Sequence, residues 1–152
     1  MNIKVCGITD LEQLHQMDKL MVDYAGFVFD SSSYQCVAGK LNPKEVKYAK
    51  VDLKKVGVFV NAELNFVLDT VLDYGLDLVQ LSGKESPDYC KSLSREITVI
   101  KTFYIDEFNS EKIHQVIPFR LIAPDPVRNP ALCPKQNLIL HSQKHPLFSS
   151  PL

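Results

Sequence analysis

Short apolar, β-branched runs alternate with helical patterns along most of the chain, and this alternation narrows the possible folds more than any other feature. Five expected strands are each followed by an expected helix, at a spacing of roughly 20 to 30 residues. The strands are almost entirely apolar, which is typical of strands buried on both faces of a parallel sheet. Two architectures fit: an open doubly wound sheet, or part of a (β/α)8 TIM barrel. The strands are expected at residues 3–8, 24–29, 55–60, 76–81 and 97–103.

Polar caps and prolines mark the expected helices. Asp10, Asn42 and Ser86 each stand directly before a helical pattern, where a short polar side chain can accept from free backbone N–H groups. Proline follows two of these caps, and Gly75 ends the third helix. The helices are expected at residues 11–20, 43–50, 63–74, 86–94 and 110–117. The third should bury one apolar face made of Leu64, Val67, Leu68, Val71 and Leu72.

From Phe119 onward the pattern changes. Residues 120–123 could begin a sixth strand and residues 137–141 a further short one, but prolines recur from Pro124 and no helical period remains. Gly83 is the last glycine, although parallel α/β proteins normally need glycines at tight turns and phosphate loops. Two interpretations of this tail stay open: an irregular, disordered Pro-rich segment, or sequence translated in a shifted reading frame.

Charge and cysteine usage argue against several classes of function. The formal net charge is −1 with no cluster of Lys and Arg, which argues against binding to nucleic acid. No apolar run approaches the roughly 20 residues of a membrane helix, and the turn at Thr9 and Asp10 comes too early for a signal peptide. The four cysteines form no CxxC pair and no metal-ligand spacing. We therefore expect a cytoplasmic protein with reduced thiols and no metal.

Four short segments stand in an order and spacing that one known family shares. They are Lys4–Thr9 (KVCGIT), Gly26–Phe29 (GFVF), Val56–Asn61 (VGVFVN) and Val79–Glu85 (VQLSGKE). Together they resemble phosphoribosylanthranilate isomerase of tryptophan biosynthesis. The resemblance implies a partial (β/α)8 TIM barrel of about five to six βα units. Residues 1–118 would form the N-terminal part of the barrel, and residues 119–152 would be an unmatched, irregular tail, with the second half of the barrel missing or replaced.

The resemblance also implies a reaction and its residues. The family carries out an Amadori rearrangement of N-(5′-phosphoribosyl)anthranilate, a small phosphosugar, without a cofactor. By resemblance, Cys6 is the general base that takes a proton from the sugar C2. A thiol needs nearby positive charge or donors to act in this way. The general acid of the family is an aspartate at the end of strand six, for which Asp125 is the candidate. The structural alternatives are a small buried residue for Cys6 and an exposed turn residue for Asp125.

The sequence departs from the family pattern at several substrate-binding positions. Gln35 stands where the family has an arginine that holds the anionic substrate, and a neutral amide cannot make that bidentate, charged contact. Ser82 replaces a histidine, while Gln80 and Gly83 are retained. The glycine-rich phosphate loops that the family carries after strands seven and eight have no match. Gln35, Gln80 and Gly83 stand at the remaining substrate-binding positions that the resemblance implies, and they are the candidate substrate-binding residues.

An incomplete barrel has consequences for assembly. Five or six parallel strands cannot close an eight-stranded barrel, so two strand edges stay open to pairing. A homo-oligomer, an open rearranged sheet or an unstable chain would each follow from such edges. Two functional hypotheses therefore stay open. The chain is a cofactor-free isomerase that depends on Cys6, or it is a non-catalytic remnant that only self-associates or binds.

Overall fold

The computed structural model describes residues 2–104, 119–122 and 137–142 of the chain. The helix expected at residues 110–117 lies outside these ranges. Five parallel strands form the body of a single sheet and follow one another in chain order. They are β1 (Lys4–Cys6), β2 (Tyr24–Val28), β3 (Lys54–Phe59), β4 (Leu78–Leu81) and β5 (Thr98–Tyr104).

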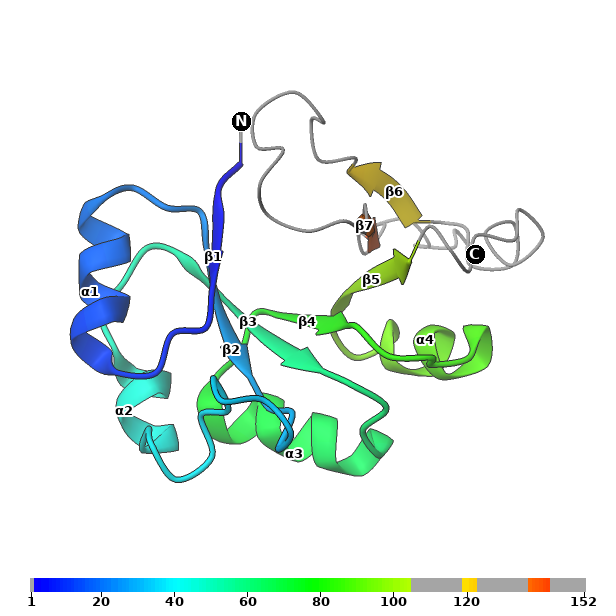
Figure 1. Cartoon of the computed structure of the whole chain (residues 1–152), viewed down its shortest axis with the longest axis horizontal. Helices are drawn as coiled ribbons and strands as arrows, with labels where there is room; N and C mark the ends of the chain where they lie inside the picture. Colours follow the sequence, from blue (N-terminus) through cyan, green and yellow to red (C-terminus); the bar gives the residue numbers. More distant parts are fainter. Residues whose placement is uncertain (1, 105–118, 123–136, 143–152) are drawn as a thin grey trace, which may run out of the picture.

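The order of these strands decides between the two predicted architectures. Each of the five pairs in parallel with its sequence neighbours. A doubly wound sheet reverses its strand order at a switch point, whereas a (β/α)8 barrel adds strands in sequence. The observed order is therefore that of a partial barrel. Figure 1 shows these strands as a curved sheet with the helices along its outer side.

Four helices connect the parallel strands, and their predicted caps are confirmed. The Asp10 carboxylate accepts from the Gln13 backbone N–H (2.8 Å), and Asn42 and Ser86 accept in the same way at the next two capped helices. Gly75 ends its helix with a left-handed φ of 61°, a conformation that favours glycine. The helices are α1 (Leu11–Lys19), α2 (Pro43–Tyr48), α3 (Leu64–Tyr74) and α4 (Pro87–Leu93).

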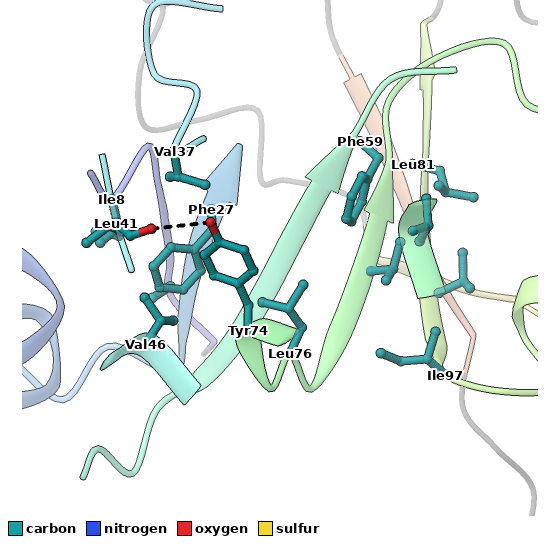
Figure 2. Close-up of a cluster of buried hydrophobic side chains, with 14 of the residues drawn as sticks. Ile8, Phe27, Val37, Leu41, Val46, Phe59, Tyr74, Leu76, Leu81 and Ile97 are labelled. Atoms are coloured by element: carbon teal, nitrogen blue, oxygen red, sulfur yellow. Dashed lines mark hydrogen bonds between the residues drawn. The ribbon is translucent and has the colours of Figure 1, made fainter. Parts of the chain in front are cut away.

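The main core lies between these helices and the outer face of the sheet. Phe27 and Phe59 are fully buried there. The Phe29 ring stacks on Phe59 with centroids 5.0 Å apart, and Tyr74 meets Phe29 edge-on at 4.9 Å. Figure 2 shows Tyr74 among these side chains, with its hydroxyl donating to the Leu41 carbonyl oxygen (3.4 Å). This bond ties the end of α3 to the segment that precedes α2.

The predicted apolar face of α3 is wrong at Leu72, whose side chain is 67% exposed. Val67 is fully buried, and the other three predicted positions pack at least partly against the core. Leu72 follows Val67 by five residues, which places it about 140° away around the helix axis. Thr70 and Tyr74 are buried instead, and the hydroxyl of each donates to a backbone carbonyl. Side chains whose hydroxyls are hydrogen-bonded thus extend the buried stripe beyond the apolar residues.

Buried lysines also lie on this outer face of the sheet. They were not predicted, because the strands were expected to be apolar. Lys55 of β3 is only 9% exposed, and its Nζ donates to the Val46 and Lys47 carbonyl oxygens at 3.2 Å each. These carbonyls belong to the last turn of α2, where backbone acceptors have no partner within the helix. The buried ammonium therefore holds the end of α2 against the sheet.

Two further strands extend the sheet beyond β5. They are β6 (Phe119–Ile122) and β7 (Asn137–Ser142). Both expected strands of the tail are thus present, but neither continues the parallel sheet. β7 pairs antiparallel with β5, and β6 pairs antiparallel with β7. β7, with apolar residues at 138–140, takes the edge of β5 that a sixth parallel strand would otherwise occupy. The described residues therefore contain five parallel strands, and β6 does not lie beside β5 as a sixth barrel strand would.

Burial of Cys90 in α4 makes the unfolding free energy of the chain depend on pH in the alkaline range. Burial raises the pKa of its thiol to about 11, with the nearby Glu85 carboxylate acting in the same direction and Lys101 in the opposite one. The folded chain therefore holds this proton more tightly than the unfolded chain, so its contribution to stability is full below about pH 9 and is lost as the pH rises to about 11. From pH 8 to 10.5, the wild-type chain should lose on the order of 1 to 2 kcal/mol more unfolding free energy than Cys90→Ala. Urea unfolding at both pH values measures this difference, and equal losses would contradict the prediction.

Candidate functional site

The candidate site lies on the face of the sheet that points away from the helices, which we call the inner face. Val5 packs against the main core, so its strand neighbours Lys4 and Cys6 point to the inner face. Further along the sheet this face carries a separate small apolar cluster of Val56, Leu78 and Ile100. In barrels of parallel strands, chemistry takes place at the carboxyl ends of the strands. We therefore follow the inner face to that end.

Cys6 is the last residue of β1, and its side chain is exposed. The alternative that Cys6 is a small buried residue without a catalytic role is therefore not supported. The Lys4 ammonium donates to Cys6 Sγ at 2.5 Å, because residues two apart in a strand share a face. An ammonium beside a sulfur stabilises the thiolate, which is the form of cysteine that accepts a proton. The predicted need for a positive donor near Cys6 is met within the same motif.

Gly26 of β2 provides the space that the lysine and cysteine side chains occupy. It pairs with Cys6 in the sheet. A Cβ on Gly26 would lie 2.6 Å from Cys6 Sγ and 3.1 Å from Lys4 Nζ. The glycine in the second matched motif is therefore needed for the geometry of the first.

Gly26→Ala is expected to displace the Cys6 sulfur. Overpacking of this kind costs about 1–3 kcal/mol of unfolding free energy, and it should also change the rate of Cys6 alkylation. In a Cys6→Ala background the same substitution should cost less, because the sulfur that the new methyl group meets is gone. Urea unfolding of the four proteins measures this coupling. An equal cost in both backgrounds would show that the sulfur is not the obstacle.

Gln35 lies against the turn that follows Cys6. Gly7 has a left-handed φ of 85°, and a Cβ there would lie 2.1 Å from Gln35 Nε2. The backbone N–H groups of Gly7 and Ile8 both donate to the Gly26 carbonyl oxygen (2.9 and 3.1 Å), which holds the turn to β2. The structure thus brings the predicted substrate-binding residue Gln35 against Gly7, the residue that follows Cys6. The group it presents there is a neutral amide.

Gln80, Ser82 and Thr102 form a polar cluster at the carboxyl ends of β4 and β5. Gln80 Nε2 lies 3.1 Å from Ser82 Oγ and 3.3 Å from Thr102 Oγ1, and the two hydroxyl oxygens are 3.4 Å apart. Gln80 Oε1 is buried and has no hydrogen-bond donor among the described residues. A buried amide oxygen of this kind can accept from a hydroxyl or N–H group of a ligand.

Gly83 belongs to a network of buried polar groups that the sequence reading missed. Glu85 Oε2 pairs with Lys101 Nζ at 2.8 Å, and the two side chains are 1% and 5% exposed. Glu85 Oε1 accepts from the backbone N–H groups of Asn61 (2.8 Å) and Gly83 (3.1 Å). Lys101 Nζ also donates to the Gly83 carbonyl oxygen (2.6 Å), and a Cβ on Gly83 would lie 2.4 Å from Asn61 Oδ1. The one signal in the sequence was a charged residue, Lys101, inside a strand that was expected to be buried.

A hollow of about 370 Å³ lies at the opposite end of the sheet and does not belong to this site. It is lined by the first residues of β2 and β3 together with several carboxylates. Asp18 Oδ1 accepts from the Asp52 and Leu53 backbone N–H groups, and Asp23 Oδ2 accepts from that of Ile3. These carboxylates therefore hold the loops at the N-terminal ends of the strands together.

Some predicted features fall outside what the structure describes. Asp125 lies between the described segments, so its position relative to Cys6 stays a prediction. Within residues 2–104 and the two tail strands, no group of three or more His, Cys, Asp or Glu side chains is arranged to hold a metal ion. None of the helices in that part of the chain has the length and apolarity needed to cross a membrane.

The sequence of residues 3–118 matches the family model of N-(5′-phosphoribosyl)anthranilate (PRA) isomerase. The chain is 36% identical over 122 residues to N-(5′-phosphoribosyl)anthranilate isomerase of Thermotoga neapolitana, covering 78% of this chain and 57% of the relative. It is 40% identical over 103 residues to the isomerase of Citrifermentans bemidjiense, covering 68% and 49%. The chain therefore spans about half the length of the relatives that it matches.

Solved structures of phosphoribosyl anthranilate isomerase resemble the fold of this chain. The structure of phosphoribosyl anthranilate isomerase from Thermotoga maritima matches with a TM-score of 0.63 at 33% identity, covering 66% of this chain and 49% of that one. A second isomerase structure, in complex with reduced 1-(o-carboxyphenylamino)-1-deoxyribulose 5-phosphate, matches with a TM-score of 0.60 at 32% identity, covering 66% and 52%.

Proposed function

The chain belongs to the N-(5′-phosphoribosyl)anthranilate isomerase family, and from this premise we propose that it acts in the Amadori rearrangement of N-(5′-phosphoribosyl)anthranilate in tryptophan biosynthesis. The observation that carries the proposal is the position of Cys6. Its exposed thiol stands at the carboxyl end of β1, on the inner face, in contact with an ammonium. The complex of a related isomerase with a reduced aminoketose phosphate supports the choice of a small phosphosugar as the ligand.

The proposed chemistry assigns a proton transfer to each catalytic group. A general acid, for which Asp125 is the candidate, protonates the ring oxygen of the ribose as the C1–O bond breaks and leaves a protonated imine. The Cys6 thiolate then takes the proton from C2 and becomes a neutral thiol, which yields an enolamine that tautomerises to the ketose. Each such group typically contributes ~10²–10⁴ in rate. No cofactor takes part in this scheme.

Gln35, Gln80 and Gly83 are the proposed substrate-binding residues. Gln35 is adjacent to the Cys6–Gly7 turn, and Gln80 offers a buried acceptor oxygen on the same face. Gly83 presents backbone at the end of β4, with its N–H and carbonyl already engaged by Glu85 and Lys101. We assign Gly83 to the shape of the site, and Gln35 and Gln80 to hydrogen bonds with the ligand.

Residues 1–118 are proposed as the N-terminal part of the barrel and residues 119–152 as a tail outside the family pattern. The rest of a (β/α)8 barrel would supply the loops after strands seven and eight that the family uses to bind phosphate. Gln35 in place of an arginine and Ser82 in place of a histidine favour weak binding of an anionic substrate. The competing proposal is therefore a non-catalytic remnant that keeps the fold and binds weakly.

Turnover separates the two proposals. The substrate is generated in place, and the decay of its fluorescence is followed with and without the purified chain. Decay faster than the spontaneous rate, and proportional to protein concentration, supports the isomerase. Equal decay with and without protein supports the remnant, and a shift in anthranilate fluorescence on adding the chain would then report residual binding.

Self-association and cellular location are further parts of the proposal. A related isomerase from Thermotoga maritima is described as dimeric. β1 pairs on one side with β2 and is the first strand in the described order of the sheet, so its other edge can pair with another chain. We propose a homo-oligomer in the cytoplasm, with no nucleic-acid or membrane partner. Size-exclusion chromatography with light scattering tests this, and a clean monomer at micromolar concentration counts against self-association.

A further inference from the structure

Lys4 transfers no proton in the scheme above, but its ammonium lies beside the sulfur that does. We propose that Lys4 is a positioning residue that places a positive charge beside Cys6 and so gives the carboxyl end of β1 a local preference for anions. The inference rests on the proposed function, because it concerns the residue assigned as the base. It adds a residue to the site and a property, a preference for anionic reactants, that the thiol alone does not have.

The local structure explains why the two side chains meet. Lys4 and Cys6 are two residues apart in β1, so they lie on the same face of the strand. Gly26 on the adjacent strand has no side chain to separate them. A lysine on an exposed strand usually extends its ammonium into water. Here the Lys4 side chain is half-buried, and its Nζ turns along the strand to Cys6 Sγ.

The chemistry of this pair follows from charge. The Lys4 ammonium donates to Cys6 Sγ, so the reactive sulfur lies beside a positive charge. When C2 of the sugar gives its proton to Sγ, Lys4 takes no part in the transfer. The same positive charge attracts an anionic reactant toward the sulfur. Cys6 therefore gains a preference for negatively charged partners.

Competing alkylating agents measure this preference without any need for turnover. Iodoacetate and iodoacetamide react with the same thiolate, but only iodoacetate is an anion. The ratio of their rate constants at Cys6, followed by peptide mass spectrometry at pH 7, is insensitive to the thiolate fraction and reports the local charge. Lys4→Met should lower the ratio roughly fivefold, the order expected for one unit charge a few ångströms from an anion in water. Lys4→Arg should retain it.

Matched controls show whether the effect is local. Lys44→Met removes an exposed lysine on α2 and should leave the ratio at Cys6 unchanged. The ratio at Cys36, read from the same samples, should not respond to Lys4→Met. Cys90 is buried and should stay unlabelled in every folded variant, so its labelling reveals unfolding. If Lys4→Met unfolds, the wild-type chain still decides the question, because its ratio should fall as ionic strength rises.

The outcomes for Lys4 and for the isomerase are distinguishable. The inference is overturned if the ratio is the same in the wild-type chain and in folded Lys4→Met, or if the wild-type ratio does not respond to salt. Either result can occur in an active protein. Conversely, a chain without turnover can still show the full fivefold change, in which case Lys4 sets the charge at Cys6 and the proposed reaction fails for another reason.

Discussion

Replacing Cys6 with serine is expected to reduce isomerisation of N-(5′-phosphoribosyl)anthranilate to its spontaneous rate. Serine has nearly the same shape, but its hydroxyl is not ionised near neutral pH even beside an ammonium, so it cannot take the proton from C2. Loss of a general base typically lowers the rate by ~10²–10⁴. The decay of substrate fluorescence with wild-type and Cys6→Ser protein at equal concentration measures the effect.

Cys36→Ser is the matched control for this substitution. Cys36 is a partly exposed free thiol in the loop after β2, so the same chemical change is made at a second cysteine. Its turnover should stay close to that of the wild-type chain. If Cys6→Ser keeps more than about a tenth of the wild-type rate, Cys6 is not the base, because the expected loss is at least tenfold greater than that. A wild-type chain without turnover would instead support the remnant.

Replacing Lys101 with methionine is expected to cause a large loss of stability. The substitution keeps an unbranched side chain but leaves the Glu85 carboxylate, which is 1% exposed, without its counter-charge. Removing one partner of a buried ion pair typically costs about 3–5 kcal/mol, because the remaining charge stays buried and uncompensated. Urea unfolding followed by circular dichroism, with the midpoint and slope both fitted, measures the change.

Two further variants identify the source of that loss. Lys91→Met removes an exposed lysine from α4 and should change the unfolding free energy by no more than about 0.5 kcal/mol. Lys101→Met combined with Glu85→Gln should cost less than the sum of the single changes, because the unpaired charge is no longer present. Additive costs, or a Lys101→Met midpoint equal to that of the wild-type chain, would show that the pair contributes little.

Local signals predicted most of the described fold. Asp10, Asn42 and Ser86 began their helices as expected, because N-capping depends on a short polar side chain and the next three residues. The order of the strands followed from resemblance more than from pattern, since both parallel architectures share the same alternation. The position of β7 beside β5 could not be predicted, because it depends on competition for an open strand edge by a segment more than 30 residues away.

Site residues that belong to a recognisable motif could be predicted from the sequence. Contacts between side chains of different strands could not. Cys6 and Gln35 were each expected at the site from resemblance, and the Gln35 amide lies against Gly7, the residue that follows Cys6. Lys4 was matched as part of a motif but not assigned, because the space in which its ammonium reaches Sγ is left by Gly26 in another strand. Asp125, outside the described residues, stays a prediction.

The buried ion pair of Lys101 and Glu85 was not predicted from the sequence. A lysine in a strand is ordinarily read as a residue at the edge of water, and Glu85 was matched only as the last letter of a motif. Lys101 and Glu85 lie on different elements, so their pairing is a property of the assembled loops and not of either local sequence. Hydrophobic periodicity carries no information about partners of this kind.

Glu85 has one consequence for motion in this part of the molecule. A single oxygen, Oε1, accepts from an amide in the loop after β3 and from another in the loop after β4, while Lys84 N–H donates to Asn61 Oδ1 (2.6 Å) in the return direction. Neither loop can loosen without breaking bonds that hold the other. The amides of Asn61, Gly83 and Lys84 should therefore open to exchange with solvent together, as one small cooperative unit. Any rearrangement that admits a ligand at the end of β4 would then have to move both loops, or neither.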